Sequence, residues 1–562
     1  MNQENKNCTN CKKDFIITND DFDFYAKIKV PVPTLCSLCR CKRRLMFRNF
    51  RTLYKRESSK SGEVIISMYH EDQPFPVWST EEWYKDDWDG TDFGIDFDFN
   101  KTFFEKYKEL NDKVPRFSLM VNNSKDCGYC NLCNRSSNCY FTFGCVDNEY
   151  CDYGHSIWNC RESLDCLYLF KSEFCYECID VLDSNRMLYS QECESCADSI
   201  GLYDCRGCVD CIGCVGLRNK SYHIFNKQVS KEVYKEFLAK YPISNSESIK
   251  FILENRDKLK KERPMPYMFG SHNTDVTGNH VYHAKNVKDS FDVKSGEDSR
   301  FGYTIRNMVQ SYDCNFSMDI ENCYESLFSH PYGLKFCHLA IDCTDTSYSQ
   351  FCFNSNNLFG CAGLRKKEYC ILNKQYSKKE YEDLLPKIIE HMKNTGEYGE
   401  FFPVSLSPFT YNESTLGEYY PLPKQQAIGN GYNWRDDIPF TSGQENFNLG
   451  GISEKDIYNF DFMKDKIFSC QKCTRNYRFT DHELSFYERF KLSLPLECFF
   501  CRHDARMLQR DERVLYKGKC MCSLKNHNHG NESCNVEFKT TFNPDNKQRI
   551  VYCEKCYQQE VV

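Results

Sequence analysis

The sequence has no run of about 18 apolar residues, which a membrane-spanning helix would require. Its first residues, MNQENKNCTN, also lack the charged and then apolar pattern of a secretory signal. The net charge of -7 over 562 residues excludes a histone-like polycation. Phosphate-binding loops, nucleophile elbows and zinc-protease helix motifs are absent as well. We therefore expect a cytoplasmic protein, and no residue set points to catalysis.

Cysteine, in contrast, is abundant, with 37 residues. In a reducing compartment we expect free thiols that bind metal or fill small buried spaces, rather than disulfides. Eight of them form a pattern that occurs twice, 462 positions apart, with 24 residues between two C-x2-C pairs. The two copies are Cys8, Cys11, Cys36 and Cys39, and Cys470, Cys473, Cys498 and Cys501. Two thiolate pairs on short knuckles are typical of a closed tetrahedral zinc site.

The residues around these cysteines repeat at the same offset. The matching positions are Phe15 and Tyr477, Phe24-Tyr25 and Phe486-Tyr487, Pro33 and Pro495, and Leu53-Tyr54 and Leu515-Tyr516. Each copy therefore resembles a zinc-ribbon (treble-clef-like) domain. The whole chain also resembles an uncharacterised family of large cysteine-rich zinc-ribbon proteins of candidate-phylum bacteria, sometimes labelled a coenzyme A transferase family. No residues here resemble a coenzyme A site, and the resemblance implies no particular activity.

Each zinc-ribbon copy is followed by the frame of a second zinc site. The C-terminal frame offers five candidates for four positions: Cys520, Cys522, Cys534, Cys553 and Cys556. An insertion with His527 and His529 leaves the choice between Cys520 and Cys522 open. The N-terminal frame has Ser58, Ser61, Ser79 and Glu82 instead, and serine does not replace a thiolate on zinc. We therefore predict about three zinc ions, with residues 58–85 folded around Ile65, Ile66, Trp78 and Trp83.

A basic row follows the second knuckle of each copy. On a helix, Arg40, Arg44, Arg48, Arg51 and Lys55 would share one arc, and the second copy repeats all five. The predicted nucleic-acid-binding residues are Arg40, Lys42, Arg43, Arg44, Arg48, Arg51, Lys55, Arg502, Arg506, Arg510, Arg513 and Lys517. Arginine guanidinium groups in such a row can form bidentate hydrogen bonds with phosphates. A solvated helix face and an acidic protein partner are the alternatives.

Sixteen cysteines between residues 127 and 214 are separated by multiples of three. A helix would spread such positions around its circumference, and a continuous strand would alternate them between its faces. Polyproline-II bundles need more glycine than is present here. A parallel β-solenoid with a multiple of three residues per coil explains the spacing. Residues 213–218 return as 360–365, so we predict that the solenoid is duplicated.

The role of these cysteines has two interpretations. In the second copy many are replaced by Ser, Thr, Val or Phe, which favours thiols that fill space. The run Cys205, Cys208, Cys211 and Cys214 instead allows a metal array or iron-sulfur site, and thiol redox exchange is a further alternative.

The predicted fold is mainly β, a duplicated parallel β-solenoid with helical caps between N- and C-terminal zinc-ribbon modules. The predicted segments are a zinc ribbon (1–57), a ligand-free ribbon (58–85), an acidic linker (86–118), solenoid 1 (119–230), a cap (231–265), solenoid 2 (266–377), a cap (378–395), an extended strap (396–466) and two zinc ribbons (467–517 and 518–562). We expect a noncatalytic zinc scaffold that contacts RNA, DNA or a ribonucleoprotein. A metal-cluster or redox protein and a scaffold for protein partners alone are the alternatives.

Overall fold

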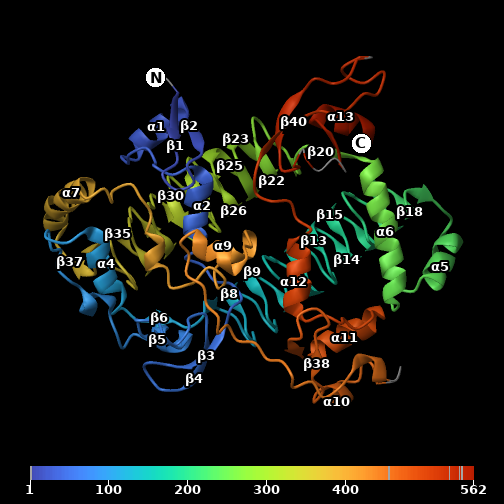
Figure 1. Cartoon of the computed structure of the whole chain (residues 1–562), viewed down its shortest axis with the longest axis horizontal. Helices are drawn as coiled ribbons and strands as arrows, with labels where there is room; N and C mark the ends of the chain where they lie inside the picture. The colour runs from blue at the N-terminus through green and yellow to red at the C-terminus, as the bar shows by residue number, and fades with distance from the viewer. Residues whose placement is uncertain (1–2, 453–455, 531, 544, 546–548, 562) are drawn as a thin grey trace. The chain divides into compact units, whose positions relative to one another are not determined.

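The computed structural model describes residues 3–452, 456–530, 532–543, 545 and 549–561 (Figure 1). The chain is mainly β, with many parallel strands and a few helices. It divides into two compact units, each built from two segments. Unit 1 is Met1–Leu119 with Met268–Asp436, and unit 2 is Met120–Tyr267 with Asp437–Val562. Among the described residues, the helices are too short or too polar to cross a bilayer.

The first β region, within unit 2, consists of short strands in parallel register. Paired residues lie twelve positions apart, as in Leu167 with Ile179 and Ile179 with Gln191. Its strands are β7 (Val121–Asn122), β8 (Asn131–Asn134), β9 (Phe143–Val146), β10 (Glu149–Asp152), β11 (Arg161–Leu164), β12 (Leu167–Phe170), β13 (Ile179–Leu182), β14 (Asn185–Leu188), β15 (Gln191–Glu194), β16 (Ala197–Ile200), β17 (Val209–Ile212), β18 (Ser221–Ile224) and β19 (Lys227–Gln228). The last pair, β18 and β19, is antiparallel.

The backbone of this region explains the spacing of its cysteines. A left-handed residue recurs every three positions, as at Asp126, Tyr129 and Leu132 with φ of 53°, 52° and 56°. Each is followed by a cysteine whose side chain joins one buried cluster, for example Cys130 and Cys133. The left-handed conformation turns the chain at every third residue, so the next side chain points inward. Asn and Asp, which tolerate this conformation, are frequent at these turns.

The second β region, within unit 1, repeats this register in one 17-stranded sheet. Its strands are β21 (Gly270–Ser271), β22 (Gly278–Tyr282), β23 (Ala284–Lys288), β24 (Ser290–Val293), β25 (Gly296–Arg300), β26 (Tyr303–Ile305), β27 (Met308–Val309), β28 (Tyr312–Asn315), β29 (Ile320–Glu321), β30 (Tyr324–Leu327), β31 (Pro331–Tyr332), β32 (His338–Ile341), β33 (Cys343–Thr344), β34 (Gln350–Phe353), β35 (Asn356–Phe359), β36 (Glu368–Ile371) and β37 (Lys374–Gln375). Most pairs again lie twelve positions apart, whereas Glu321 pairs with Tyr332, one position fewer.

Helices follow the last strands of each β region. In unit 2 these are α5 (Lys231–Lys240) and α6 (Ser246–Glu262), and in unit 1 the helix is α7 (Lys378–Asn394). Ser230 and Ser377 cap the N-termini of α5 and α7. Buried Tyr234 and Tyr381 occupy matching positions on these helices, which pack against β18 and β36. The helices predicted as caps therefore pack against the last strands of the β regions.

The two terminal modules have the same order of elements. The N-terminal module consists of β1 (Glu4–Asn7), β2 (Asp14–Ile17), α1 (Asn19–Lys27), α2 (Ser37–Leu45), β3 (Tyr54–Glu57), β4 (Val64–Ser67), β5 (Val77–Trp78) and α3 (Thr80–Tyr84). The C-terminal module consists of β38 (Phe468–Ser469), β39 (Asn476–Tyr477), α11 (Asp481–Phe490), α12 (Phe499–Met507), β40 (Tyr516–Lys519), β41 (Glu537–Thr540), β42 (Ile550–Tyr552) and α13 (Glu554–Val561). Strand β6 (Arg116–Phe117) pairs in parallel with β5, and strand β20 (Pro264–Pro266) pairs in parallel with β42.

The segment predicted as an acidic linker, residues 86–118, contains a helix that packs in the core of unit 1. Helix α4 (Phe103–Asn111) buries Phe103, Tyr107 and Leu110 completely. The aromatic ring of Phe103 contacts those of Tyr348 and Phe359 from the second β region. The end of this segment therefore contributes to packing, whereas Asp86, Asp87 and Phe99 are exposed.

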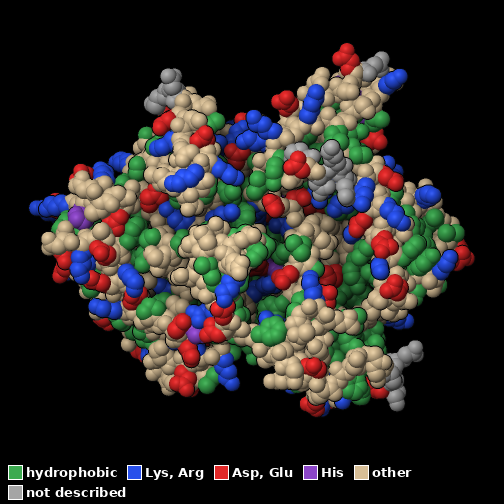
Figure 2. Space-filling view, viewed as in Figure 1, with side chains coloured by type: hydrophobic (Ala, Val, Ile, Leu, Met, Phe, Trp, Pro, Cys, Tyr) green, Lys and Arg blue, Asp and Glu red, His purple; other side chains and the backbone are tan. Residues whose placement is uncertain are grey.

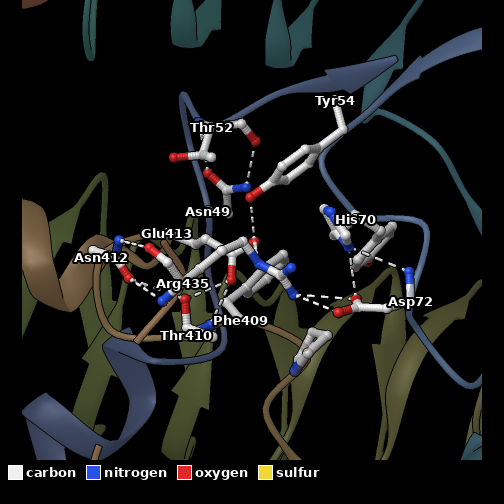
Figure 3. A network of polar contacts seen from close by, with 12 residues as sticks. Asn49, Thr52, Tyr54, His70, Asp72, Phe409, Thr410, Asn412, Glu413 and Arg435 are labelled. Atoms are coloured by element: carbon white, nitrogen blue, oxygen red, sulfur yellow. Dashed lines mark hydrogen bonds and ion pairs between the residues drawn. The ribbon is translucent and has the colours of Figure 1, made fainter. Parts of the chain in front are cut away.

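The part of the predicted strap within unit 1 is docked on the N-terminal module. Tyr54 donates a hydrogen bond to Glu413 at 2.6 Å, and Arg435 pairs with both Glu413 and Asp72 (Figure 3). Backbone contacts add to this, since the amide of Thr415 donates to the carbonyl of Arg48 at 2.7 Å. This segment therefore packs against the N-terminal module within unit 1.

Candidate metal centres

The first cysteine cluster joins the turn between β1 and β2 to the start of α2. Cys8 and Cys11 lie in a tight turn in which left-handed Lys12 donates its amide to the carbonyl of Cys8. Cys36 is the N-cap of α2, and Cys39 lies in its first turn. The four Sγ atoms lie within 4.8 Å of one another, so the predicted set can hold one metal ion.

The second cluster repeats this construction in unit 2. Thr474 takes the left-handed position and donates to the carbonyl of Cys470, as Lys12 does in the first copy. Cys498 is the N-cap of α12. Cys470, Cys473, Cys498 and Cys501 again converge within 4.8 Å. The duplicated spacing therefore produces two equivalent candidate sites.

The third cluster gathers four of the five cysteines of the C-terminal frame. Cys520, Cys534, Cys553 and Cys556 converge within 4.8 Å, and all four are buried. Cys520 directly follows β40, at the place that Ser58 takes after β3. Cys522 lies two residues further on and is not a member of this set. Four of the five predicted cysteines thus form the tetracysteine site.

Distances between sulfur atoms test whether these clusters fit a metal ion. Tetrahedral thiolate coordination with metal-sulfur bonds of about 2.3 Å places sulfur atoms about 3.8 Å apart. The separation is 3.8 Å for Cys11 and Cys36, 3.7 Å for Cys473 and Cys498, and 3.9 Å for Cys534 and Cys553. The clusters therefore have the dimensions of a closed tetrahedral site.

Hydrogen bonds to sulfur favour the thiolate form of Cys39 in the first cluster and of Cys470 in the second. A hydrogen bond from Cys36, together with one from the side chain of Asn10, lowers the pKa of Cys39 to about 5. Burial acts to raise the pKa of Cys470, but backbone amides in its own knuckle and at Cys498 lower it to about 7. Donors aimed at sulfur are what a metal-bound thiolate requires.

The ligand-free frame brings its four side chains together in the same way. Ser58 donates to a carboxylate oxygen of Glu82 at 2.5 Å, and the backbone amide of Ser79 donates to the same oxygen at 2.8 Å. Burial acts to raise the pKa of Glu82, but bonds from Ser58, Ser61 and Ser79 lower it to about 2. Of the four residues predicted to pack this ribbon, Trp83 is fully buried, whereas Ile65, Ile66 and Trp78 are half-buried.

A phosphate-binding face requires the basic row of the first copy to be exposed to solvent. In the structure this row lies mainly inside unit 1. Helix α2 ends at Leu45, so only Arg40 and Arg44 of the row are helical. Arg40 pairs with Asp313 at 2.7 Å and Arg44 with Glu325 at 2.9 Å, and all four side chains are at most 2% exposed. These guanidinium groups bind carboxylates of the second β region, against which α2 packs (Figure 1).

The remaining members of the first copy differ in exposure. Arg43 pairs with Glu325 at 2.8 Å and with Glu400 at 2.7 Å. Arg48 is buried, with its guanidinium over the rings of Phe50 and Phe316. Lys42 and Arg51 are half-buried, and Lys55, on β3, is exposed.

The second copy makes equivalent ion pairs in unit 2. Arg502 and Arg506 pair with Asp165 at 2.9 and 2.8 Å, and Arg506 also pairs with Glu177 at 2.7 Å. Arg510 pairs with Asp180 at 2.7 Å, Arg513 is buried, and Lys517 is exposed. Asp313 and Glu325 each lie 148 positions after Asp165 and Glu177, so both copies use matching carboxylates. Sequence reasoning missed them, because the repeat of residues 213–218 at 360–365 has an offset of 147, which matches Asp165 with Tyr312 and Glu177 with Tyr324.

The carboxylates of the two copies differ in their preferred charge. Burial acts to raise the pKa of Glu325, but Arg43, Arg44 and Arg40 outweigh it and lower the pKa. Burial dominates at Glu177 and raises its pKa to about 7 despite Arg506. Glu325 is therefore held charged more firmly than Glu177.

The cysteines of the first β region are buried in one cluster and bonded to backbone. Cys160 donates to the carbonyls of Trp158 and Leu169, and Ser172 donates in the same way to Phe170. A serine can therefore take the same position, which supports a space-filling role. Burial raises the pKa of Cys166, which favours its neutral thiol form.

Cys133 and Cys145 occupy equivalent positions of neighbouring parallel segments, with Cα atoms 4.6 Å apart. The twelve-residue register brings such side chains together.

Comparison with known proteins adds no relative: no protein-family model matches this chain, and neither does any curated protein.

Proposed function

We propose that this protein is a noncatalytic scaffold whose terminal modules are folded around zinc. The sulfur separations of 3.7–3.9 Å carry the proposal, because they match the edges of a tetrahedral zinc-thiolate site. Small ribbons have little apolar core, so the free energy of metal binding becomes free energy of folding. Zinc would thereby hold in place the helices whose arginines engage each β region.

The proposal includes a β-solenoid for each β region. The register of twelve residues, a multiple of three, supports it, since each turn of the chain would then add one layer. Rigid stacking of this kind suits a framework that presents surfaces at fixed separations.

Metal content and local protection test the proposal together. Anaerobically purified protein should contain zinc in at least the three tetracysteine sites by elemental analysis. Removal of zinc by a chelator should increase hydrogen exchange and proteolysis in residues 4–45 and 468–556, while the β regions keep their protection. Fewer than three zinc ions, or ribbons that stay protected without metal, would contradict it.

A nucleic acid or ribonucleoprotein partner is part of this proposal and rests on the exposed members of the predicted set. Lys55 and Lys517 are exposed and occupy matching positions on β3 and β40. Basic and acidic side chains are interspersed on the face drawn in Figure 2. K55A/K517A should weaken RNA or DNA binding and flatten its dependence on salt. K285A/K424A, which removes two exposed lysines elsewhere, is the control, and binding that resists both changes excludes this surface.

A metal array inside the first β region is the second candidate. Cys205, Cys208, Cys211 and Cys214 are all fully buried in one cluster, and the backbone amide of Cys208 donates to Sγ of Cys196 at 3.4 Å. Iron or visible absorption in anaerobic protein, lost in C205S/C208S, would favour this function. A colourless protein that contains zinc alone would count against it.

A further inference from the structure

The insertion in the last ribbon gathers a second group of metal-ligating side chains. Cys522, His527 and His529 converge with Cys556, and one ligand atom from each lies within 4.8 Å of the others. Sγ of Cys522 is 3.3 Å from Nδ1 of His527 and 3.3 Å from Nε2 of His529. Cys522 and Cys556 are both fully buried. Two imidazoles and two thiols are a common ligand set for zinc.

Oxygen atoms lie beside the outer nitrogen of each histidine. Nδ1 of His529 lies 2.6 Å from the backbone carbonyl of Glu532, so this nitrogen carries the proton. Nε2 of His527 lies 3.9 Å from a carboxylate oxygen of Glu560, within ion-pair distance but beyond that of a hydrogen bond. Metal-binding histidines are held by such carbonyl and carboxylate partners.

The tautomer of His529 matters for the group at Cys522. With its proton on Nδ1, His529 turns an unprotonated Nε2 toward the sulfur of Cys522. A cation at the centre of the group would bind this nitrogen together with the sulfur and Nδ1 of His527.

We propose that Cys522, His527 and His529 bind a further zinc ion, and that Cys556 serves both this ion and the tetracysteine site. Cys556 belongs to both groups of ligands, so its thiolate can bridge the two ions. This inference rests on the proposed zinc site at Cys520, Cys534, Cys553 and Cys556. It raises the expected content from three zinc ions per chain to four.

Elemental analysis of three full-length variants tests this inference. C522S and H527A/H529A should each lower the zinc content from four ions to three. H272A/H391A, which removes two histidines from unit 1, should leave four. C522S changes only one atom of a buried side chain, so it separates loss of the ion from misfolding of the ribbon. Cobalt substitution provides the second readout, because absorption that depends on His527 and His529 should disappear while the tetrathiolate bands persist.

The outcomes separate this inference from the proposed function. Wild-type protein with three zinc ions, or four ions retained in C522S, overturns the additional site and leaves the tetracysteine sites standing. Fewer than three ions in wild-type protein contradicts the proposed function itself.

Discussion

The second ribbons of the two terminal modules, residues 54–84 and 516–561, have the same fold and different centres. Each has an antiparallel hairpin, a short strand and a helix, in the same order. In the C-terminal ribbon four buried cysteines meet at the centre. In the N-terminal ribbon two serine side chains and a backbone amide donate hydrogen bonds to the carboxylate of Glu82.

The difference lies in what stabilises the centre of each ribbon. The N-terminal ribbon replaces coordination with hydrogen bonds to one carboxylate and with the fully buried ring of Trp83. Trp83 contacts Phe117 and Phe353 of the same unit, so packing against neighbouring elements compensates for the missing ligands. The C-terminal ribbon keeps its thiols and carries the insertion with His527 and His529.

Removing the metal ligands should destabilise the C-terminal ribbon far more than the N-terminal ribbon. Structural zinc contributes about 10–16 kcal/mol in small metal-dependent domains, so C553S/C556S should unfold residues 516–561. The corresponding S79A/E82A should leave residues 54–84 folded but less stable. Hydrogen exchange measured by mass spectrometry reports both segments in one sample, and equal loss of protection in the two would refute the distinction.

Restoring cysteines should convert the N-terminal ribbon into a metal site. We expect S58C/S61C/S79C/E82C to bind one additional zinc ion, because these four positions already converge. Elemental analysis and cobalt absorption check the gain. A variant that keeps Ser58 and changes only the other three is the control and should bind zinc far more weakly. An unchanged metal content would show that the frame is too wide for coordination.

Breaking one buried ion pair should cost more in unit 1 than in unit 2. R44M removes two ion pairs, to Asp313 and Glu325, whose side chains are both 0% exposed. Arg40 and Arg43 remain as partners of these carboxylates, so the loss should approach the value of about 3–5 kcal/mol for a broken buried pair without exceeding it. R506M strands Glu177, which is 18% exposed and has a pKa near 7, so it can be hydrated or protonated. Local unfolding free energies from hydrogen exchange measure both, and R44M/E325M should recover much of the loss. A larger cost for R506M would contradict this order.

As the pH falls, the C-terminal ribbon should lose stability at a higher pH than the N-terminal ribbon. Glu82 has a folded pKa of about 2, below its ordinary 4.5, so its contribution is present above pH 4.5 and is lost as the pH falls toward 2. Zinc leaves as thiolates are protonated, which should occur at higher pH in the C-terminal ribbon. E82Q should remove the acid dependence of residues 54–84 and cost about 1–3 kcal/mol at neutral pH. Protection of the two ribbons followed from pH 7 to 3 tests this.

Much of the candidate metal chemistry could be predicted from residues alone. Each C-x2-C pair lies in one short turn, so the spacing alone identifies the two clusters that contain Cys8 and Cys470. The period of three also has a local cause, a left-handed residue at every third position. Helix α2 was predicted too long, because the row of basic residues continues past Leu45 into β3.

Long-range contacts decided the rest. A charged row such as Arg40 and Arg44 reads as solvent-exposed until the fold places Asp313 and Glu325 against it, 270 or more residues away. The choice of Cys520 over Cys522 likewise depended on where the insertion folds. Spacing along the chain determines ligands within one turn or hairpin, whereas pairing of charges from distant segments depends on which surfaces the tertiary structure buries together.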